Sequence, residues 1–580
     1  MKRNRTCGEL RKSDEGTIVT LSGWVHKYRN LGGLLFLDLR DRYGITQVIF
    51  DPEVVSSEVM DICTKIRNEY VVTVQGIVNV KPEPNKNLPT GEIEIEAKKI
   101  RIENESETPP FNFLNGSSDA REDKRLEYRY LDLRSERMTR NIVIRHKATL
   151  AVRQFLSDRG FLEIETPTFS KSTPEGARDY VVPSRLFPGS FYALPQSPQI
   201  YKQLLMVSGF DKYFQIARCF RDEDARGDRQ PEFTQIDIEK SFTDQEEIFK
   251  LTEEMYYDMF LKALDTKIES KFVRLTYHES MEKYGVDKPD LRFGLTLKNI
   301  TDIKDSFDFK VINSAEHVKF IAVEGLEGLS RKQIKVYEDY AIHLGAKGLA
   351  FVKYIDGKLE GGISKFLSEE NMVEIIKRSE LTKNGIIFFG ADSTAIVNKV
   401  LGNLRNKIGK ELELYDPKEF KFCWITDFPM FEFNDEENRW EAMHHMFTMP
   451  RECDIEKLDT NPGEVLGICY DLVLNGVELA SGSIRIHDEN IQNKVFRTLG
   501  LPQEEIDEKF GFMLKAFKYG APPHGGIAPG LDRTIQIMCG EDTIREVIAF
   551  PKAKNLNCPM MKAPSPISED QLNELNIKLK

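Results

Sequence analysis

Residues 220–235, FRDEDARGDRQPEFTQ, concentrate charged side chains between two stretches that have the pattern of β-strands. Arg221 would stand at the rim of this hairpin, where its planar guanidinium could hold a phosphate or a carboxylate. Phe233, in the second arm, could stack on a nucleotide base. A surface hairpin with solvated charges is the alternative interpretation. The segment is typical of chemistry in which ATP activates a carboxylate, provided that partner side chains come from elsewhere in the chain.

A second group of chemical side chains surrounds the Asn-Gly dipeptide at 475–476, which favours a two-residue type I′ turn. This turn predicts that Leu472 faces Leu479 and that Asp471 and Glu478 lie on one face as diagonal neighbours, about 7–8 Å apart at the backbone. Two carboxylates so placed could converge on Mg²⁺, which accompanies nucleotide phosphates. Two solvated acids on an exposed sheet face are the alternative.

The third group ends at Arg533. The glycines and prolines of residues 519–530 predict a loop that lets the backbone approach a ligand closely. A helix is expected from about Leu531, which places Arg533 in its first turn, where the helix dipole favours anions instead. An anionic ligand or a stacked base would explain this arginine, and an incidental arginine at an ordinary helix start is the alternative.

Neither a GxxxxGK[ST] loop nor a GxGxxG after a strand occurs, so both the P-loop and the Rossmann fingerprints are absent.

These residues need several domains to position them, because 580 residues exceed what one core holds. Three predicted strands, a helix and two more strands in residues 1–105 follow the order of an OB-fold barrel, which binds single-stranded nucleic acid. A β module without a ligand has the same order and stays open. Residues 106–139 are expected to form a hinge and linker. A helix from Arg140 follows, ended by Gly160, and then the strand FLEIETP.

Residues 285–415 are predicted to form an αβ unit with its own core, here called the αβ insert, because three strands alternate with three helices. The insert divides a larger domain into residues 140–284 and residues 416–580. A β-rich pattern resumes after the insert, and the chain ends in a predicted helix. The fold class expected is therefore α+β, multidomain, with an N-terminal OB-fold β-barrel.

Composition limits the class of protein further. The formal net charge of −12 argues against non-specific coating of nucleic acid, although it leaves room for a local basic surface. Eight cysteines without a CxxC pair predict reduced thiols in a cytoplasmic protein, and no structural zinc is expected. The sequence has no run of about 18 apolar residues, so no membrane span is predicted. The charged N-terminus lacks the apolar stretch of a secretory signal.

Taken in order, these motifs resemble those of the class II aminoacyl-tRNA synthetases. Motif 1 resembles the helix from Arg140 with FLEIETP, motif 2 resembles residues 220–235, and motif 3 resembles GLDR with its helix. The segments TPEGARDYVVPSR, QSPQIYKQLL, QIDIE, AMHHMFT and VELASGSIRIH resemble the aspartyl-tRNA synthetases of bacterial type. The resemblance extends from the N-terminus to about Pro564 and includes the αβ insert.

The resemblance implies an OB-fold anticodon-binding domain and a catalytic domain on an antiparallel sheet flanked by helices. It implies a homodimer with motif 1 at its interface. The implied reaction joins L-aspartate to ATP as an adenylate and then transfers the aspartyl group to the 3′ end of tRNA(Asp). Asparaginyl- and lysyl-tRNA synthetases, and a non-catalytic RNA-binding relative, are the rivals.

The resemblance also implies a role for individual residues. Three would be catalytic: Arg221, Glu478 and Arg533. The implied aspartate site comprises Glu175, Ser197, Gln199, Lys202, Arg221, Gln235, Asp237, His444, His445 and Arg485. The implied ATP site comprises Arg221, Asp222, Glu223, Gln230, Phe233, Glu478, Gly530, Leu531, Asp532 and Arg533. Asp471 and Glu478 would hold Mg²⁺, in agreement with the hairpin argument. Which of the two histidines lies closer to the substrate stays open.

Two cations, Lys202 and Arg485, support aspartate as the substrate on physical grounds. A neutral amide would leave both buried and unpaired, at a cost of several kcal/mol by the general penalty for unpaired buried charge. Size alone would exclude glutamate by only about 1–3 kcal/mol, so that selection rests on the resemblance.

In the predicted OB-fold barrel, the resemblance matches Phe36 and Gln47 to positions that meet the anticodon, and Arg29 adds local positive charge for anticodon binding. Phe36 could stack on a base and Gln47 could bind a base edge. A place for Phe36 in the barrel core is the alternative. Leu31 resembles the form that charges only tRNA(Asp), and whether the chain also charges tRNA(Asn) stays open.

Overall fold

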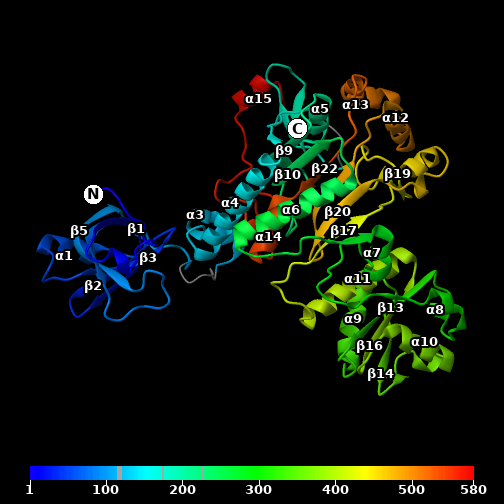
Figure 1. Cartoon of the computed structure of the whole chain (residues 1–580), viewed down its shortest axis with the longest axis horizontal. Helices are drawn as coiled ribbons and strands as arrows, with labels where there is room; N and C mark the ends of the chain where they lie inside the picture. The colour runs from blue at the N-terminus through cyan, green and yellow to red at the C-terminus, as the bar shows by residue number, and fades with distance from the viewer. Residues whose placement is uncertain (114–119, 173–175, 225, 580) are drawn as a thin grey trace. The chain divides into compact units, whose positions relative to one another are not determined.

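The computed structural model of the chain describes residues 1–113, 120–172, 176–224 and 226–579. The chain divides into two compact units (Figure 1). The first comprises residues 1–143 and 548–565, and the second comprises residues 144–547 and 566–580. The division into five domains predicted from the sequence remains our proposal.

The first unit contains a closed five-stranded barrel with the strand order β1-β2-β3-β5-β4. Its elements, in chain order, are β1 Ile18–Leu31, β2 Leu34–Asp41, β3 Gly44–Phe50, α1 Ser57–Lys65, β4 Val71–Val80 and β5 Ile93–Asn104. Along β2, alternate residues Leu35, Leu37 and Leu39 are buried in the barrel core, as the period of two in a strand requires. The predicted OB-fold order is confirmed. Two short helices follow, α2 Glu122–Glu127 and α3 Arg129–Asp132.

The helix expected from Arg140 is α4, Glu136–Ser157, so it begins four residues earlier than predicted. Of the apolar residues spaced three and four apart along this helix, Ala148, Val152 and Phe155 are buried and Ile144 is half-buried. Gly160 follows at φ +79°, a conformation that suits glycine after a helix end. The strand expected in FLEIETP shortens to β6, Leu162–Glu163.

The second unit is built around an eight-stranded sheet with the order β11-β17-β20-β21-β22-β10-β9-β6. All neighbours pair antiparallel except β11 with β17 and β6 with β9, which pair parallel. The strands are β9 Lys212–Phe220, β10 Glu232–Ser241, β11 Val273–Thr276, β17 Phe422–Thr426, β20 Cys469–Leu474, β21 Val477–Ile484 and β22 His524–Pro529. Helix α6, Gln245–Leu264, packs on this sheet through Phe249, which stacks on Trp424 at 4.1 Å between ring centroids. The predicted antiparallel sheet is therefore confirmed, with a parallel pair near each edge.

Strand β22 corrects the expectation of a loop in residues 519–530. His524–Pro529 forms a central strand between β21 and β10. Glycine is required there because neighbouring strands approach closely: a Cβ on Gly526 would lie 2.1 Å from the Ile238 carbonyl oxygen and 2.2 Å from Glu239 Oε2. The glycines therefore serve strand packing, whereas the local pattern resembled a turn.

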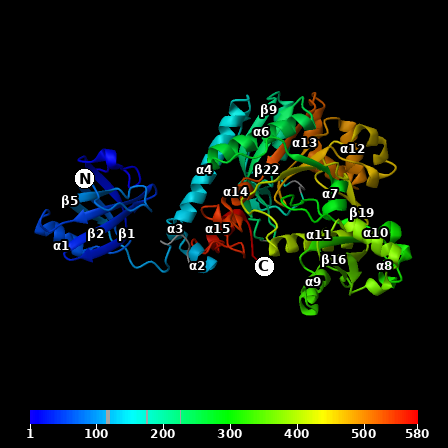
Figure 2. The same ribbon diagram turned by 60° about the horizontal axis from the view of Figure 1, so that its bottom comes forward.

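The αβ insert contains its own five-stranded sheet, in the order β12-β13-β16-β14-β15. Its elements are β12 Lys298–Asn299, α8 Lys310–Asn313, β13 His317–Glu324, α9 Arg331–His343, β14 Ala350–Ile355, β15 Lys358–Glu360, α10 Glu369–Ser379, β16 Gly385–Asp392 and α11 Thr394–Glu411. Both views place the sheet between α9 and α11 on one side and α8 and α10 on the other (Figures 1 and 2). Alternate residues of β16 supply the two cores, with Ile386 and Phe388 in one and Ile387 and Phe389 in the other. The predicted separate core is confirmed.

The remaining elements complete the second unit. They are α5 Gln199–Val207, α7 Tyr277–Tyr284, α12 Glu489–Thr498, α13 Gln503–Phe517, α14 Leu531–Cys539 and α15 Glu569–Leu575, with the small hairpins β7 Val181–Pro183 with β8 Phe191–Ala193, and β18 Phe431–Asn434 with β19 Arg439–Ala442. Short 3₁₀ turns lie at Lys12–Asp14, Thr301–Ser306, Ser364–Phe366, Glu452–Leu458, Pro462–Glu464 and Ile544–Glu546. Among the described helices, none combines the length and apolar character needed to cross a membrane.

Candidate active site

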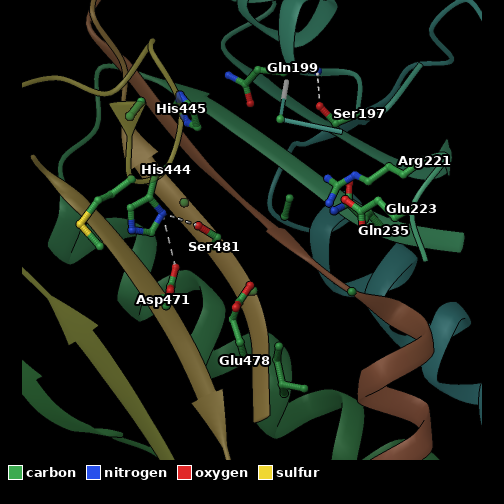
Figure 3. Close-up of a pocket in the computed structure, with 18 of the residues that line it drawn as sticks. Ser197, Gln199, Arg221, Glu223, Gln235, His444, His445, Asp471, Glu478 and Ser481 are labelled. Atoms are coloured by element: carbon green, nitrogen blue, oxygen red, sulfur yellow. Dashed lines mark hydrogen bonds and ion pairs between the residues drawn. The ribbon is translucent and has the colours of Figure 1, made fainter. Parts of the chain in front are cut away.

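A cavity of about 1080 Å³ opens on the eight-stranded sheet of the second unit. That volume is at the upper end of the usual range for ligand sites, so a nucleotide and an amino acid fit together. Most of the predicted site residues line it: Ser197, Gln199, Lys202, Arg221, Glu223, Gln230, Phe233, Gln235, Asp237, His444, His445, Asp471, Glu478, Arg485, Gly530, Asp532 and Arg533. Figure 3 shows Arg221, Glu223 and Gln235 on one side of the cavity, facing Asp471, Glu478 and Ser481 on the other.

Two described residues of the predicted site do not line the cavity. Asp222, which follows the end of β9, is absent from the lining, and its Oδ2 lies 3.7 Å from Arg178 Nε. Leu531 is also absent from the lining and is buried at the start of α14. Glu175 lies outside the described residues.

The hairpin formed by β9 and β10 carries Arg221 and Phe233 into the cavity. Phe233 pairs with Cys219 in the strand register, two residues before Arg221. The guanidinium carbon of Arg221 lies 5.1 Å from the centroid of the Phe233 ring. Arg221 Nε is buried and has no hydrogen-bond partner among the described residues. Because an unpaired buried donor is costly, this nitrogen indicates that a ligand completes the site.

Arg533 and its neighbour Asp532 both have protein partners. Arg533 donates from Nη1 to the carbonyl oxygen of Glu478 at 3.0 Å, and its Nη2 lies 3.0 Å from Asp228 Oδ2. The sequence alone suggested that a ligand explains a cation at the start of α14. These two contacts show that protein groups already hold Arg533 there. The carboxylate of Asp532 accepts from the Thr234 backbone N–H at 2.8 Å and from Arg145 Nη1 at 2.5 Å. Asp532 therefore joins α14 to β10 and α4.

The predicted turn at Asn475 and Gly476 is confirmed, since both residues have positive φ, +52° and +80°. The predicted pairing of Leu472 with Leu479 is wrong. Leu472 pairs with Ala480, because a bulge places an extra residue in β21 between Glu478 and Ala480. The residues of the turn therefore determine the pairing of the two strands only as far as the first bulge.

Asp471 and Glu478 nevertheless line the same cavity. Burial, and then the neighbouring carboxylate of Glu478, raises the pKa of Asp471 well above its usual range. Burial alone would raise the pKa of Glu478, but Lys288 and then Arg533 lower it overall. Asp471 Oδ1 is buried and has no hydrogen-bond partner among the described residues, although His444 Nδ1 lies 3.8 Å away.

This donor set fits Mg²⁺. Two carboxylates held together at a cost in repulsion, with one oxygen unsatisfied, are stabilised by a cation. Mg²⁺ is commonly bound by one or two carboxylates together with substrate phosphates, so no larger protein cage is needed. Among the described residues, no group of three or more His, Cys, Asp or Glu side chains is placed so that it could hold a metal.

Lys202 and Arg485 form the opposite, cationic end of the cavity, but they are not the unpaired cations that the sequence suggested. Lys202 Nζ lies 2.9 Å from Asp237 Oδ1 and 3.5 Å from Glu239 Oε2. Arg485 Nε donates to Glu239 Oε1 at 2.9 Å, and Nη2 donates to Oε2 at 3.2 Å. All four side chains are almost fully buried. Two acids thus balance two cations before any substrate binds.

Glu239 is the residue that sequence reasoning missed. Burial alone would raise its pKa, but Arg485 and then Lys202 lower it, so the side chain stays charged. The signal was present in QIDIEK, where Asp237 and Glu239 alternate with the apolar residues Ile236 and Ile238 and so fall on one face of a strand. Two acids on a buried face require buried cations as partners.

The two adjacent histidines have different surroundings. His444 Nδ1 lies 3.0 Å from Ser481 Oγ, and burial lowers the pKa of His444 to about 4. Burial, and then Arg485, lowers the pKa of His445 well below its usual value, so this ring is neutral at pH 7. His445 lies at the cationic end, where its Nε2 is 2.5 Å from Arg485 Nη1.

The hydrogen bonds of His445 determine which nitrogen carries its proton. The Phe447 backbone N–H donates to Nδ1 at 3.2 Å, so the proton of the neutral ring resides on Nε2. Nε2–H can donate to Ser483 Oγ at 3.3 Å, and Arg485 Nη1 lies beside the same nitrogen at 2.5 Å. Two donors side by side could each bind one oxygen of an anionic group, which makes this the point of the cavity best suited to a carboxylate.

The three predicted anticodon residues lie on the barrel of the first unit. Phe36 is half-buried and alternates with the core residues Leu35 and Leu37, so its placement in the barrel core is excluded. Arg29 pairs with Phe36 across β1 and β2, and its guanidinium lies 5.9 Å from the ring centroid. Gln47 Oε1 accepts from Lys81 Nζ at 2.7 Å.

The sequence of the chain matches two families of known proteins. Residues 121–554 match the family described as tRNA synthetases class II (D, K and N). The chain belongs to this family. Residues 19–103 of the synthetase match the OB-fold nucleic acid binding domain.

Curated relatives match the synthetase along its whole length. The aspartate–tRNA(Asp/Asn) ligase of Treponema denticola is 51% identical, over 100% of this chain and 99% of the relative. The ligase of the same name from Rubrobacter xylanophilus is 52% identical, over 100% of this chain and 97% of the relative.

Solved structures share the fold of the synthetase at lower identity. The asparaginyl-tRNA synthetase of Pyrococcus horikoshii complexed with asparaginyl-adenylate has a TM-score of 0.61 at 18% identity, over 95% of this chain and 98% of that chain. A putative aspartyl-tRNA synthetase of Leishmania major has a TM-score of 0.60 at 21% identity, over 93% of this chain and 92% of that chain. At this identity the likeness concerns the fold alone.

Proposed function

We propose that this synthetase is an aspartate–tRNA ligase that works in two steps. An oxygen of the aspartate α-carboxylate forms a bond to the α-phosphorus of ATP, and the bond to pyrophosphate breaks. The 3′-terminal ribose hydroxyl of the tRNA then attacks the carbonyl carbon of the adenylate and releases AMP. About 50% identity to aspartate–tRNA ligases over the whole chain supports this assignment.

The observation that carries the proposal is the division of one cavity into two chemical ends. Arg221, Phe233 and Arg533 line the same space as Lys202 and Arg485. The first three suit a nucleotide, because arginines bind phosphates and an aromatic ring stacks on a base. The last two, with His445 Nε2–H, suit a carboxylate. An adenylate joins a nucleotide to an amino acid, and this cavity accommodates both in contact.

Catalysis in this proposal is mainly positioning and charge stabilisation. Arg221, whose Nε lacks a partner among the described residues, holds the α-phosphate and the attacking carboxylate together. Phe233 and Arg533 hold the adenine between them, and Glu223, which also pairs with Arg229 at 2.7 Å, binds its edge. Asp471 and Glu478 would hold Mg²⁺. Bound Mg²⁺ supplies positive charge that offsets the phosphate oxygens.

Selection of aspartate rests on a balanced set of charges rather than on free cations. Lys202 and Arg485 are held by Asp237 and Glu239, so their positions are defined before the substrate arrives. The substrate side-chain carboxylate accepts hydrogen bonds from Arg485 and from His445, which lie side by side at the cationic end of the cavity. Asparagine cannot satisfy both donors, because its amide presents a single acceptor and a competing N–H₂ donor.

Isotope exchange between pyrophosphate and ATP tests the proposal without tRNA. Exchange is expected with aspartate and is expected to be absent with asparagine or lysine. Substitution Arg221→Ala is expected to reduce exchange by about 100-fold or more, as for loss of a donor to developing charge. Arg218→Ala is the matched control, since Arg218 pairs with exposed Glu232 on the same hairpin and does not line the cavity. Exchange with asparagine or lysine in place of aspartate would contradict the assignment.

The tRNA partner has two candidates, tRNA(Asp) alone or tRNA(Asp) together with tRNA(Asn). The curated relatives are named for both tRNAs, and this favours dual charging here. Leu31 favours charging of tRNA(Asp) alone, and it lies 60% exposed at the end of β1, near Phe36 and Arg29 in the sequence and the sheet.

Aminoacylation of both purified tRNAs separates the two candidates. Dual charging is expected to give comparable kcat/KM values for tRNA(Asp) and tRNA(Asn), whereas a discriminating enzyme charges tRNA(Asn) at least about 100-fold less well, the range that lost base contacts produce. Substitution Leu31→His tests the role of this residue. A changed ratio of the two kcat/KM values would show that Leu31 acts in the choice of tRNA.

We also propose a homodimer that acts in the cytoplasm. The elements that resemble motif 1 expose apolar side chains: Leu150 on α4 is 55% exposed and Leu162 on β6 is 51% exposed. Apolar residues so exposed are typical of an interface. Among the described residues, which include all eight cysteines, no disulfide forms, and this agrees with a reducing compartment.

A further inference from the structure

The αβ insert contributes residues to the active-site cavity. Asp287 and Lys288, in the segment that enters the insert from α7, both line the cavity. Lys288 Nζ lies 3.2 Å from Glu478 Oε2 and 3.8 Å from Asp287 Oδ2. The lysine thus touches the carboxylate pair that is proposed to hold Mg²⁺, although its role was not anticipated.

The segment that carries Lys288 is clamped by the last helix of the insert. Arg405 of α11 is fully buried and donates to the backbone carbonyl oxygens of Asp290 at 2.9 Å and Phe293 at 2.7 Å. Its guanidinium also lies 4.1 Å from the centroid of the Phe293 ring. A Cβ on Gly409, on the same helix, would lie 2.5 Å from that ring. Backbone carbonyls held this way leave the segment little freedom to move.

The segment is also fixed from the catalytic side. Gly476, in the turn between β20 and β21, approaches Asp290 so closely that a Cβ there would lie 3.3 Å from the Asp290 Cβ. Asp290 in turn accepts three hydrogen bonds from the side chain of Arg292, at 3.0, 3.3 and 2.6 Å. The turn that orients Glu478 and the segment that orients Lys288 are therefore packed directly together.

We propose that Lys288 forms an ion pair with Glu478 when no metal ion is bound. This ion pair must break when a divalent cation binds. The inference rests on the proposed role of Asp471 and Glu478. An ammonium 3.2 Å from one carboxylate oxygen neutralises part of the charge of the pair. A divalent cation and the ammonium repel each other, so both cannot hold Glu478 at once.

This arrangement has a chemical use. Without a cation, the carboxylates of the buried Asp471 and the half-buried Glu478 would repel each other and distort the hairpin that carries them. Lys288 keeps the hairpin in its binding geometry, and its side chain is 44% exposed, so it can swing into solvent when it is displaced. The αβ insert in this way prepares the metal site of the catalytic sheet.

Binding of Mn²⁺ to the full-length enzyme, measured by electron paramagnetic resonance without nucleotide or aspartate, tests the inference. Removal of the competing ammonium by Lys288→Met is expected to tighten Mn²⁺ binding about two- to fivefold, the range for a partly exposed ion pair. Lys288→Arg keeps the cation and is expected to bind like the wild type. Glu478→Gln is expected to abolish the tight site.

Lys298→Met is the matched control, because Lys298 forms an ion pair of 2.6 Å with Glu380 in the insert and does not line the cavity. Its Mn²⁺ affinity is expected to be unchanged. Unchanged or weaker binding by Lys288→Met overturns the inference, as does absence of binding in both the wild type and the variant. Pyrophosphate exchange is measured separately, so these outcomes leave the proposed function standing if exchange with aspartate occurs.

Arg405→Lys tests the positioning by the insert. Lysine retains charge but loses the planar fork that reaches several carbonyls. If Arg405 acts through Lys288, Arg405→Lys is expected to tighten Mn²⁺ binding in the wild type and to have no further effect in Lys288→Met. Additive effects of the two substitutions would contradict the positioning role, and the Lys288→Met result still decides the main inference if the arginine variant does not fold.

Discussion

At the scale of single residues, the buried charges of the cavity are held as pairs. Glu239 contacts Lys202 and Arg485, and it lies on β10 two residues from Asp237. A side chain that neutralises two cations defines their positions without itself meeting the substrate in our proposal. Glu239 is therefore a positioning residue, and its loss is expected to affect stability as well as aspartate binding.

Substitution Glu239→Gln is expected to lower the free energy of unfolding by about 3–5 kcal/mol, the usual cost of leaving a buried charge unpaired. It is also expected to raise the KM for aspartate more than it lowers kcat, because Lys202 and Arg485 lose their common anchor. Urea unfolding followed by circular dichroism measures the first effect, and pyrophosphate exchange measures the second.

Glu232→Gln on the same strand is the control for this prediction. Glu232 pairs with Arg218 at 2.6 Å, but both side chains are about a third or more exposed. Such a pair contributes at most about 1 kcal/mol. Equal destabilisation by the two substitutions would contradict the role assigned to Glu239.

At the scale of elements, the strands around the cavity depend on close approach of backbones. Strand β22 lies between β10 and β21, and a Cβ on its Gly526 would overlap both the Ile238 carbonyl oxygen and the Glu239 carboxylate. The absence of a side chain at Gly526 therefore lets β22 pair with β10. It also leaves space for Glu239, which holds Lys202 and Arg485.

Substitution Gly526→Ala is expected to destabilise the protein by about 3 kcal/mol, the upper end of the range for overpacking, because the clash involves backbone. Displacement of Glu239 is also expected to weaken aspartate binding. Gly511→Ala in α13 is the control: a Cβ there meets nothing within 4 Å. Alanine favours a helix over glycine by about 0.5–1 kcal/mol, so the control is expected to be neutral or stabilising. Thermal unfolding compares the two variants, and a neutral Gly526→Ala would contradict the packing argument.

At the scale of the whole molecule, the property to test is assembly into a homodimer. A dimer through the elements resembling motif 1 would cover Leu150 and Leu162, which are otherwise exposed. Burial of such side chains stabilises association in proportion to the apolar area removed from water.

Substitution Leu150→Asp is expected to shift the protein from dimer to monomer, because a buried charge without a partner opposes association. Sedimentation equilibrium measures the mass directly. Val336→Asp in α9 is the control, since Val336 is also 55% exposed but lies in the αβ insert. A wild type that sediments as a monomer, or equal effects of the two substitutions, would contradict the proposed interface.

Much of this architecture follows from the sequence alone, because local physical rules determine it. The order of strands and helices in the barrel follows from the period of apolar residues, and so does the alternation of β13, β14 and β16 with α9, α10 and α11 in the insert. The short elements β12, β15 and α8 were not predicted. The turn at Asn475 and Gly476 follows from the need for positive φ at both positions. The order of the three motifs along the chain indicates the family, and most of the residues predicted for the site line one cavity.

Tertiary structure decided the remaining features, because they depend on contacts between distant segments. The bulge in β21 and the central place of β22 depend on neighbouring strands. Lys288 meets Glu478 across 190 residues of sequence. Residues 220–235 alone indicated an arginine and an aromatic ring for a nucleotide. Only the folded sheet shows that the cations awaiting the second substrate are already paired, since a buried charge must find its partner wherever the fold provides one.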